Sequence, residues 1–98
     1  MMVNTRVAYK PLSYIHLVLI VLVWRDTMRD EILDRIGGRI RFLRMEREIS
    51  QEKFALSIGM DRTYYASVEL GKRNISILNL KKIVDGFGIS FEELFRGV

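Results

Sequence analysis

The stretch SQEKFALSIGMDRTYYASVE, Ser50 to Glu69, decides the fold. It holds two short runs with helix-like apolar spacing, and the runs are joined at Gly59. Glycine adopts the left-handed backbone conformation that ends a helix at low cost, so we expect one helix to stop there and another to begin soon after. The second run places Arg62, Thr63 and Ser67 on the side that a core does not use. The stretch therefore predicts a helix pair whose second member offers polar side chains to a partner.

Residues that can cap a helix N-terminus occur at four places with the same surroundings. An apolar residue stands directly before each cap, and a second apolar residue stands four positions after the cap. The two apolar residues can form a hydrophobic staple. The sets, cap first, are Ser50 with Ile49 and Phe54, Asp61 with Met60 and Tyr65, Ser76 with Ile75 and Leu80, and Ser90 with Ile89 and Leu94. Ser90 and Glu93 also form a capping-box pattern, and glycines at 59, 71 and 88 follow the runs. We predict an all-α fold of five helices, at about 31–47, 51–58, 62–70, 77–87 and 91–96.

The chain divides into two segments of different character. From Met28 onward, apolar residues at three- and four-residue spacings define one face of the first predicted helix; they are Ile32, Leu33, Ile36, Ile40 and Leu43. Residues 1–27 instead contain LSYIHLVLIVLVW, Leu12 to Trp24, which has no charged residue. This run is shorter than the roughly 20 apolar residues of a spanning helix, and no small-residue cleavage pattern of a signal peptide follows it. We therefore predict an apolar N-terminal arm at 1–27 and a helical domain at 28–98.

The arm leaves several interpretations open. Two interpretations are a β-strand that pairs with a copy of itself and an apolar arm folded onto the domain. A third is upstream sequence translated from a start site set too early, because Met28 begins a self-sufficient stretch. A further interpretation is an imperfect membrane anchor, although we expect no membrane partner. In the case of an early start site, the arm carries no function.

Composition excludes several kinds of chemistry. The chain has no cysteine and a single histidine, His16, so neither a disulfide framework nor a zinc cluster can form. It contains no P-loop, no G-x-G-x-x-G and no GxSxG, and we expect neither an enzyme nor a cofactor or metal. A net charge of +4 and a pI near 9.7 are compatible with a polyanionic partner.

The third predicted helix has two different sides. At 100° per residue, Tyr65 and Val68 face the core, while Thr63, Ala66, Ser67 and Leu70 lie opposite, with Arg62 and Tyr64 at the flanks. Short side chains allow close approach to a DNA major groove, where an arginine can reach a guanine edge. We expect Lys72 and Arg73 to meet phosphates after this helix, and Gln51 to do so at the start of the preceding helix.

From Ile36 to Phe95 the chain resembles the Cro and phage-repressor type of helix-turn-helix, the xenobiotic-response-element family of bacterial and phage regulators. The residues that carry the resemblance are IGGRIRFLR, then SQEKFALSIGMDRTYYASVELGKRNIS, then LKKIVDGFGISFEELF. Within that family the chain is most similar to controller proteins of restriction-modification systems and to prophage repressors. The resemblance implies a five-helix, lambda-repressor-like fold, a DNA-reading third helix and a symmetric dimer on a pseudo-palindromic operator.

The resemblance also implies roles for individual residues. Base edges are assigned to Arg62, Thr63 and Ser67, with Tyr64 contacting bases or phosphates; phosphates are assigned to Gln51, Lys72, Arg73 and Asn74, with Arg39 and Arg41 as secondary candidates. Arg44 and Glu69 match a structural salt bridge that locks the third helix to the scaffold. The chain departs from the family pattern at Glu48, where glycine is usual, at Leu70, where a polar residue is common, and at Phe42, which lies off the buried face.

These assignments predict a cytoplasmic, nucleoid-associated transcription regulator without a cofactor. Its two reading helices would enter successive major grooves with half-site centres about 34 Å apart. Dimerisation is expected near Phe91 and Phe95, with the arm as an alternative. Regulation by excluding RNA polymerase or by contacting it is left open. The alternative function is an antitoxin or protein-interaction module that uses the helical domain and the apolar arm.

Overall fold

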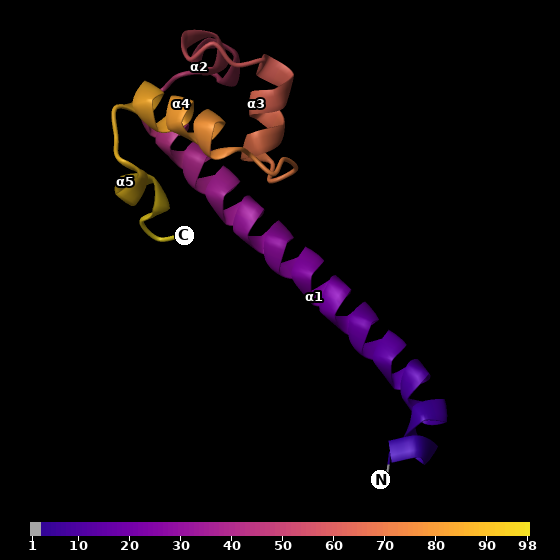
Figure 1. Ribbon diagram of the computed structural model, residues 1–98. Coiled ribbons are helices and arrows are strands. Elements are labelled where there is room, and N and C mark those ends of the chain that lie inside the picture. The colour runs from indigo at the N-terminus through magenta and orange to yellow at the C-terminus, as the bar shows by residue number, and fades with distance from the viewer. Residues whose placement is uncertain (1–2) are drawn as a thin grey trace.

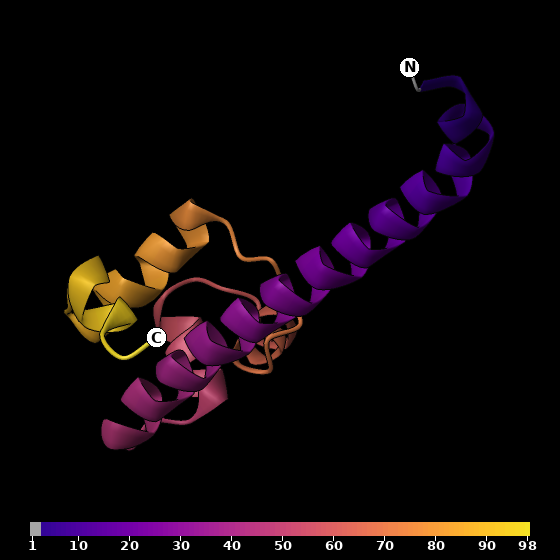
Figure 2. The same ribbon diagram turned by 90° about the horizontal axis from the view of Figure 1, so that it is seen from below.

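The computed structural model describes the backbone of residues 3–98 and the side chains of 14–25 and 31–98, and it has five helices over that range. They are α1 (Val3–Glu46), α2 (Gln51–Ser57), α3 (Arg62–Glu69), α4 (Ile77–Phe87) and α5 (Phe91–Phe95). The four short helices gather at the C-terminal end of α1, while the rest of α1 extends away from them (Figures 1 and 2). The radius of gyration is 20.2 Å, against about 13 Å for a compact chain of this length, because of this extension.

The predicted caps start α2 to α5. The side chains of Ser50, Asp61, Ser76 and Ser90 accept hydrogen bonds from the backbone N–H three residues on. Ser90 and Glu93 form the complete capping box. Gly88 ends α4 with a φ of 73°, the left-handed conformation that glycine adopts most readily. The predicted bounds of α2 to α5 are therefore confirmed to within one residue.

The prediction for the first helix is wrong at its N-terminal end. The helix begins at Val3 rather than near residue 31, so it crosses the predicted boundary at 27/28 without a break. The strand interpretation of the arm is wrong because residues 12–24 are helical, and the folded-arm interpretation is wrong because Tyr14–Trp24 are exposed. A helix satisfies its own backbone hydrogen bonds, whereas a lone strand leaves them unmet. Among the described residues, no helix is both long and apolar enough to cross a membrane.

The core lies between the C-terminal third of α1 and the four short helices. Its members are Ile40, Leu43, Phe54, Ala55, Met60, Tyr65, Val68, Leu80, Ile83, Val84, Phe87 and Leu94. Phe54 stacks on Phe87 with ring centroids 4.3 Å apart and contacts the tilted ring of Tyr65 at 5.4 Å. These aromatic contacts fix α2 between α3 and α4, and so set the direction in which α3 faces.

Gly37 allows α1 to approach α3 closely. A Cβ atom at this position would lie 2.5 Å from the carbonyl oxygen of Val68 and 2.6 Å from that of Glu69. A Cβ at Gly38, one residue later, would have no neighbour within 4 Å. The Gly37-Gly38 pair that interrupts the apolar pattern of α1 thus contains one residue required by packing and one that is not.

Candidate nucleic-acid interface

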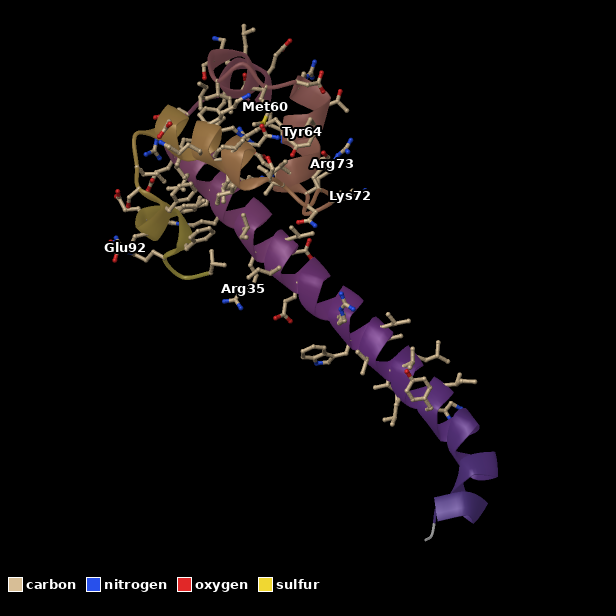
Figure 3. The ribbon with its side chains drawn as sticks, in the orientation of Figure 1. Arg35, Met60, Tyr64, Lys72, Arg73 and Glu92 are labelled. Atoms are coloured by element: carbon tan, nitrogen blue, oxygen red, sulfur yellow. The ribbon has the colours of Figure 1, made fainter. Side chains whose placement is uncertain are left out.

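Helix α3 presents two sides, as its sequence predicts. Tyr65, Val68 and Glu69 are buried, whereas Arg62 and Thr63 are exposed at its N-terminal end. The Asp61 carboxylate accepts from the Tyr64 N–H at 2.9 Å and fixes the first turn. Figure 3 shows Tyr64, Arg73 and Lys72 on the same side of the domain, on α3 and the loop that follows it. Three of the residues predicted to contact DNA, Tyr64, Lys72 and Arg73, therefore lie on one side of the domain.

A hydrogen-bonded cluster joins α3 to the loop and to α4. The Ser67 hydroxyl donates to the Tyr64 carbonyl at 2.6 Å and accepts from Arg73 Nε at 3.1 Å. The Arg73 guanidinium lies 5.3 Å from the centre of the Tyr64 ring, and Asn79 Nδ2 donates to the Tyr64 hydroxyl at 3.2 Å. Ser67, predicted to read a base, here holds Arg73 against α3. Asn79 was not predicted to contribute, although a polar residue directly before the core residue Leu80 was a usable signal.

A buried ion pair locks α3 to α1. Arg44 Nε and Nη2 donate to the Glu69 carboxylate at 2.6 and 3.0 Å, and Arg44 Nη1 donates to the Ile49 carbonyl at 2.8 Å. The Glu69 side chain is 1% exposed and that of Arg44 is 11% exposed. The predicted pair thus forms, and it is buried enough for the loss of one partner to leave an uncompensated charge.

The ion pair sets the charge states around it. Burial by itself would raise the pKa of Glu69, but hydrogen bonds from Arg44 and from Gln51 outweigh it, and the pKa is lowered. The hydrogen bond to Glu69 raises the pKa of Arg44. Burial raises the pKa of Tyr65, and the adjacent carboxylate raises it further. Glu69 and Arg44 are therefore both charged near neutral pH.

A cleft of about 650 Å³ opens beside this ion pair, between α1, α2 and α3. It is lined by Arg41, Arg44, Ser50, Gln51, Glu52, Arg62, Ala66 and Leu70. Gln51 uses one amide hydrogen for Glu69, at 2.8 Å, which leaves its second N–H for another acceptor. Arg62 lies 3.8 Å from Glu52, and both side chains are about two-thirds exposed, so this pair is screened by water. The cleft gathers three of the predicted DNA-contacting residues, Arg41, Gln51 and Arg62.

Arg39 lies elsewhere. Its guanidinium donates to the backbone carbonyls of Leu94 at 3.1 Å and Glu93 at 2.9 Å, and it lies 5.7 Å from the centre of the exposed Phe42 ring. These contacts hold α5 against α1. The structure thus gives Arg39 a scaffold contact, and its position beside a phosphate stays a prediction.

Two of the departures from the family pattern are explained by their positions. Glu48 adopts a φ of 52°, the left-handed conformation in which a glycine is usual, because the chain turns there between α1 and α2. Leu70 is exposed and lines the cleft, so it belongs to the candidate interface rather than to the core.

The helix-turn-helix family model matches residues 40–94, more than half of the chain. The control protein C.MunI of a Mycoplasma species is 49% identical over 70 residues, which make up 70% of this chain and 95% of that protein. The crystal structure of the restriction-modification controller protein C.AhdI from Aeromonas hydrophila superposes with a TM-score of 0.64 and 40% identity, over 66% of this chain and 98% of that one. The controller protein C.Esp1396I, solved as a tetramer with its natural 35 base-pair operator, superposes with a TM-score of 0.61 and 31% identity, over 65% of this chain and 84% of that one. On these matches, the chain belongs to the helix-turn-helix family.

Proposed function

We propose that this protein binds double-stranded DNA sequence-specifically as a dimeric transcription regulator, with α3 inserted into the major groove. Its residues act by binding rather than by catalysis, and no cofactor is needed. In this proposal Arg62, Thr63 and Tyr64 reach base edges, and Ser67 and Asn79 hold the surrounding side chains in place. Phosphates on either side are bound by Gln51 and Arg41, and by Lys72, Arg73 and Asn74 in the loop after α3.

The observation that carries the proposal is the arrangement of α3 itself. Glu69 and Arg44 lock the C-terminal end of this helix to the scaffold, while Arg62 and Thr63 remain exposed at its N-terminal end. A helix can read base edges only when its orientation is fixed and its outer side is free to approach the groove. The basic residues of the loop after α3 extend the same surface toward the DNA backbone.

The relatives support this proposal. C.MunI is named a control protein, and the C.Esp1396I tetramer was solved bound to its operator. Solved variants of C.Esp1396I carry substitutions at three consecutive residues, an arginine, a threonine and a tyrosine. In this chain Arg62-Thr63-Tyr64 is the only consecutive run of those three residue types. We therefore give this tripeptide the central part in DNA recognition.

The dimer is proposed to form through α4 and α5. Ile77 and Leu78 at the start of α4 are exposed, and so is Phe95 in α5. The Phe95 ring stacks on the Phe91 ring with centroids 6.3 Å apart. Exposed apolar side chains at a protein surface are typical of an interface with another protein.

The test is in vitro selection from random duplex DNA with the full chain. We expect enrichment of a two-fold-related sequence whose half-site centres lie about one helical turn apart. The matched control is the Thr63→Arg, Tyr64→Ala variant, which alters exposed or half-exposed residues of α3 and should lose the enriched sequence while its helical content is kept. Enrichment of no sequence by well-folded wild-type protein would contradict the proposal and favour the protein-interaction module.

A further inference from the structure

The part of α1 that extends away from the helical domain is covered with exposed apolar side chains. Every large hydrophobic residue from Tyr14 to Trp24 is exposed, with fractions from 37% for Val18 to 68% for Tyr14. Neither ribbon view places another helix of the chain beside this region (Figures 1 and 2). A helix that is apolar on all sides is normally buried by a partner.

Two shallow grooves run along this segment on opposite sides of the helix. The first, of about 360 Å³, is lined by Tyr14, Leu17, Val18, Val21, Leu22 and Arg25, and we call these six residues the stripe. Their spacing of three and four residues places them on one face over three turns. The second groove, of about 470 Å³, is lined by Leu19, Ile20, Val23 and Trp24 and is shorter along the helix. At 100° per residue, the polar residue His16 falls on that second side, so the stripe is the longer continuous apolar face.

The four inner residues of the stripe have the same pattern when they are read in either direction. Leu17 and Leu22 lie equally far from the midpoint between residues 19 and 20, and so do Val18 and Val21. A two-fold axis through that midpoint would place Leu17 against Leu22 of a second copy, and Val18 against Val21 of that copy. An interface made by a two-fold axis requires this self-complementarity of one surface patch.

The two ends of the stripe select the direction of pairing. Tyr14 and Arg25 are the terminal members, also equally far from the midpoint. In a parallel pair, each Arg25 would lie beside the same cation of the other copy and repel it. In an antiparallel pair, each guanidinium would lie over the Tyr14 ring of the other copy, which is a favourable cation–π arrangement.

We propose that the occupant of the stripe is a second copy of this chain, paired with it antiparallel through residues 14–25. The paired segment is about 18 Å long and about 10 Å wide. The area that it can bury is therefore much less than the roughly 800 Å² per partner of a standard stable interface. The pairing is therefore reversible and depends on protein concentration. It is a second contact between copies, separate from the dimer surface on α4 and α5.

The pairing places two helical domains at opposite ends of a helix pair. Ile36, where α1 first contacts the core, is about 25 Å along the helix from the midpoint of the stripe. The two domains are thus roughly 50 Å apart along the axis. Such a pair can link two separately bound DNA sites, or two dimers on neighbouring sites.

Sedimentation of the full chain without DNA tests the contact independently of the proposed function. The mass of the wild-type protein should rise with concentration beyond that of the dimer formed through α4 and α5, and Val18→Glu should raise the concentration for half-association in this second step at least tenfold. Val21→Lys should do the same alone, whereas an equal mixture of the two variants should regain association, because antiparallel pairing brings the introduced carboxylate and ammonium groups together. Val23→Glu, the matched control in the second groove, should associate like the wild type. Loss of association in Val23→Glu alone, or a wild-type mass that is independent of concentration, would overturn the proposal.

The direction is tested by cross-linking, for which the absence of native cysteine is an advantage. Tyr14→Cys and Arg25→Cys chains, mixed and oxidised, should form a disulfide-linked heterodimer, while each chain alone should form little homodimer. Homodimers of Tyr14→Cys would indicate parallel pairing and overturn the antiparallel assignment. Flotation of the wild-type chain with phosphatidylcholine–phosphatidylglycerol vesicles, together with the absence of cross-links in solution, would show that a lipid surface covers the stripe instead.

Discussion

The Arg44 guanidinium and the Glu69 carboxylate, 25 residues apart in sequence, form a two-hydrogen-bond ion pair between α1 and α3. It connects the long scaffold helix to the last residue of the proposed reading helix. The pair is almost entirely shielded from water, and Gln51 adds a third hydrogen bond to the carboxylate. The orientation of α3 therefore depends on a charge interaction as well as on the apolar core.

Removal of one partner should be more costly than removal of both. Arg44→Met leaves the Glu69 carboxylate buried without its counter-ion, and we expect a loss of about 3–5 kcal/mol in the free energy of unfolding. The double variant Arg44→Met, Glu69→Met should lose less, because no charge then remains buried. Urea denaturation of both variants checks the expectation, and equal losses would mean that packing rather than charge dominates at this site.

Stability should fall on acidification because of Glu69. The pKa of this carboxyl is lowered in the folded protein, so its contribution is fully present above the unfolded value of about 4.3. It is lost as the pH falls through the lower folded value. The matched variant Glu69→Gln lacks this titration, so its stability should change less between about pH 5 and pH 3. Parallel curves for the two proteins, measured by urea denaturation at several pH values, would contradict the assignment.

The neighbouring glycines of α1 should respond in opposite directions to alanine. Gly37→Ala introduces a Cβ against two backbone carbonyls of α3, and neither carbonyl can move aside cheaply. We expect a loss of about 1–3 kcal/mol, with some displacement of α3. Gly38→Ala meets open space within the helix, so it should raise stability by up to about 1 kcal/mol. The midpoints of thermal or urea unfolding, compared between the two variants, give the answer directly.

Replacing Glu48 with glycine should make the folded protein more stable. Its φ of 52° is unfavourable for a residue with a side chain, and the turn requires it. Glu48→Gly should raise the free energy of unfolding by about 0.5–1 kcal/mol, after the greater freedom of glycine in the unfolded chain is subtracted. Glu46→Gly is the control: this exposed residue is the last of α1, so the same change should lower stability by up to about 1 kcal/mol. A loss in both variants would show that Glu48 makes a favourable contact that outweighs its conformation.

Arg62 and Lys72 should separate base reading from phosphate binding. Arg62→Ala should weaken binding to the selected sequence by about 1–3 kcal/mol and relax the preference at one base position. Lys72→Ala should weaken binding to selected and scrambled duplexes alike. It should also make the slope of log K against log salt concentration less steep, by the amount expected for about one phosphate contact. Fluorescence anisotropy over a series of salt concentrations measures both quantities. If the two variants behave in the same way, the roles are assigned wrongly.

Local sequence signals predicted most of the helical domain. Ser50, Asp61, Ser76 and Ser90 each bond to a backbone N–H three residues on, so the information that starts each helix lies within one turn of it. For the same reason, the alternation of Tyr65 and Val68 with exposed neighbours was enough to orient α3. The ion pair of Arg44 and Glu69 was found only through the family resemblance.

Long-range contacts and an ambiguous segment account for what was missed. Arg39 bonds to carbonyls 54 and 55 residues away, and no local pattern marks such a partner. Asn79 contacts Tyr64 across the loop between α3 and α4, which sequence spacing does not predict. The run from Val18 to Val23 is rich in β-branched residues and favours a strand by propensity, but it lies between helical turns and continues α1. Propensity is a weak guide where no second strand is present.

The hydrogen bond from Arg73 to Ser67 has an energetic consequence for recognition. A free arginine side chain samples many rotamers, and fixing it on binding costs about 1.5–2 kcal/mol of conformational entropy. Here the guanidinium is already placed over the Tyr64 ring, and Tyr64 is itself held by Asn79. Much of that ordering therefore takes place when the protein folds. The entropy cost of ordering this part of the surface therefore lowers the stability of the folded protein, and it does not weaken the affinity for DNA.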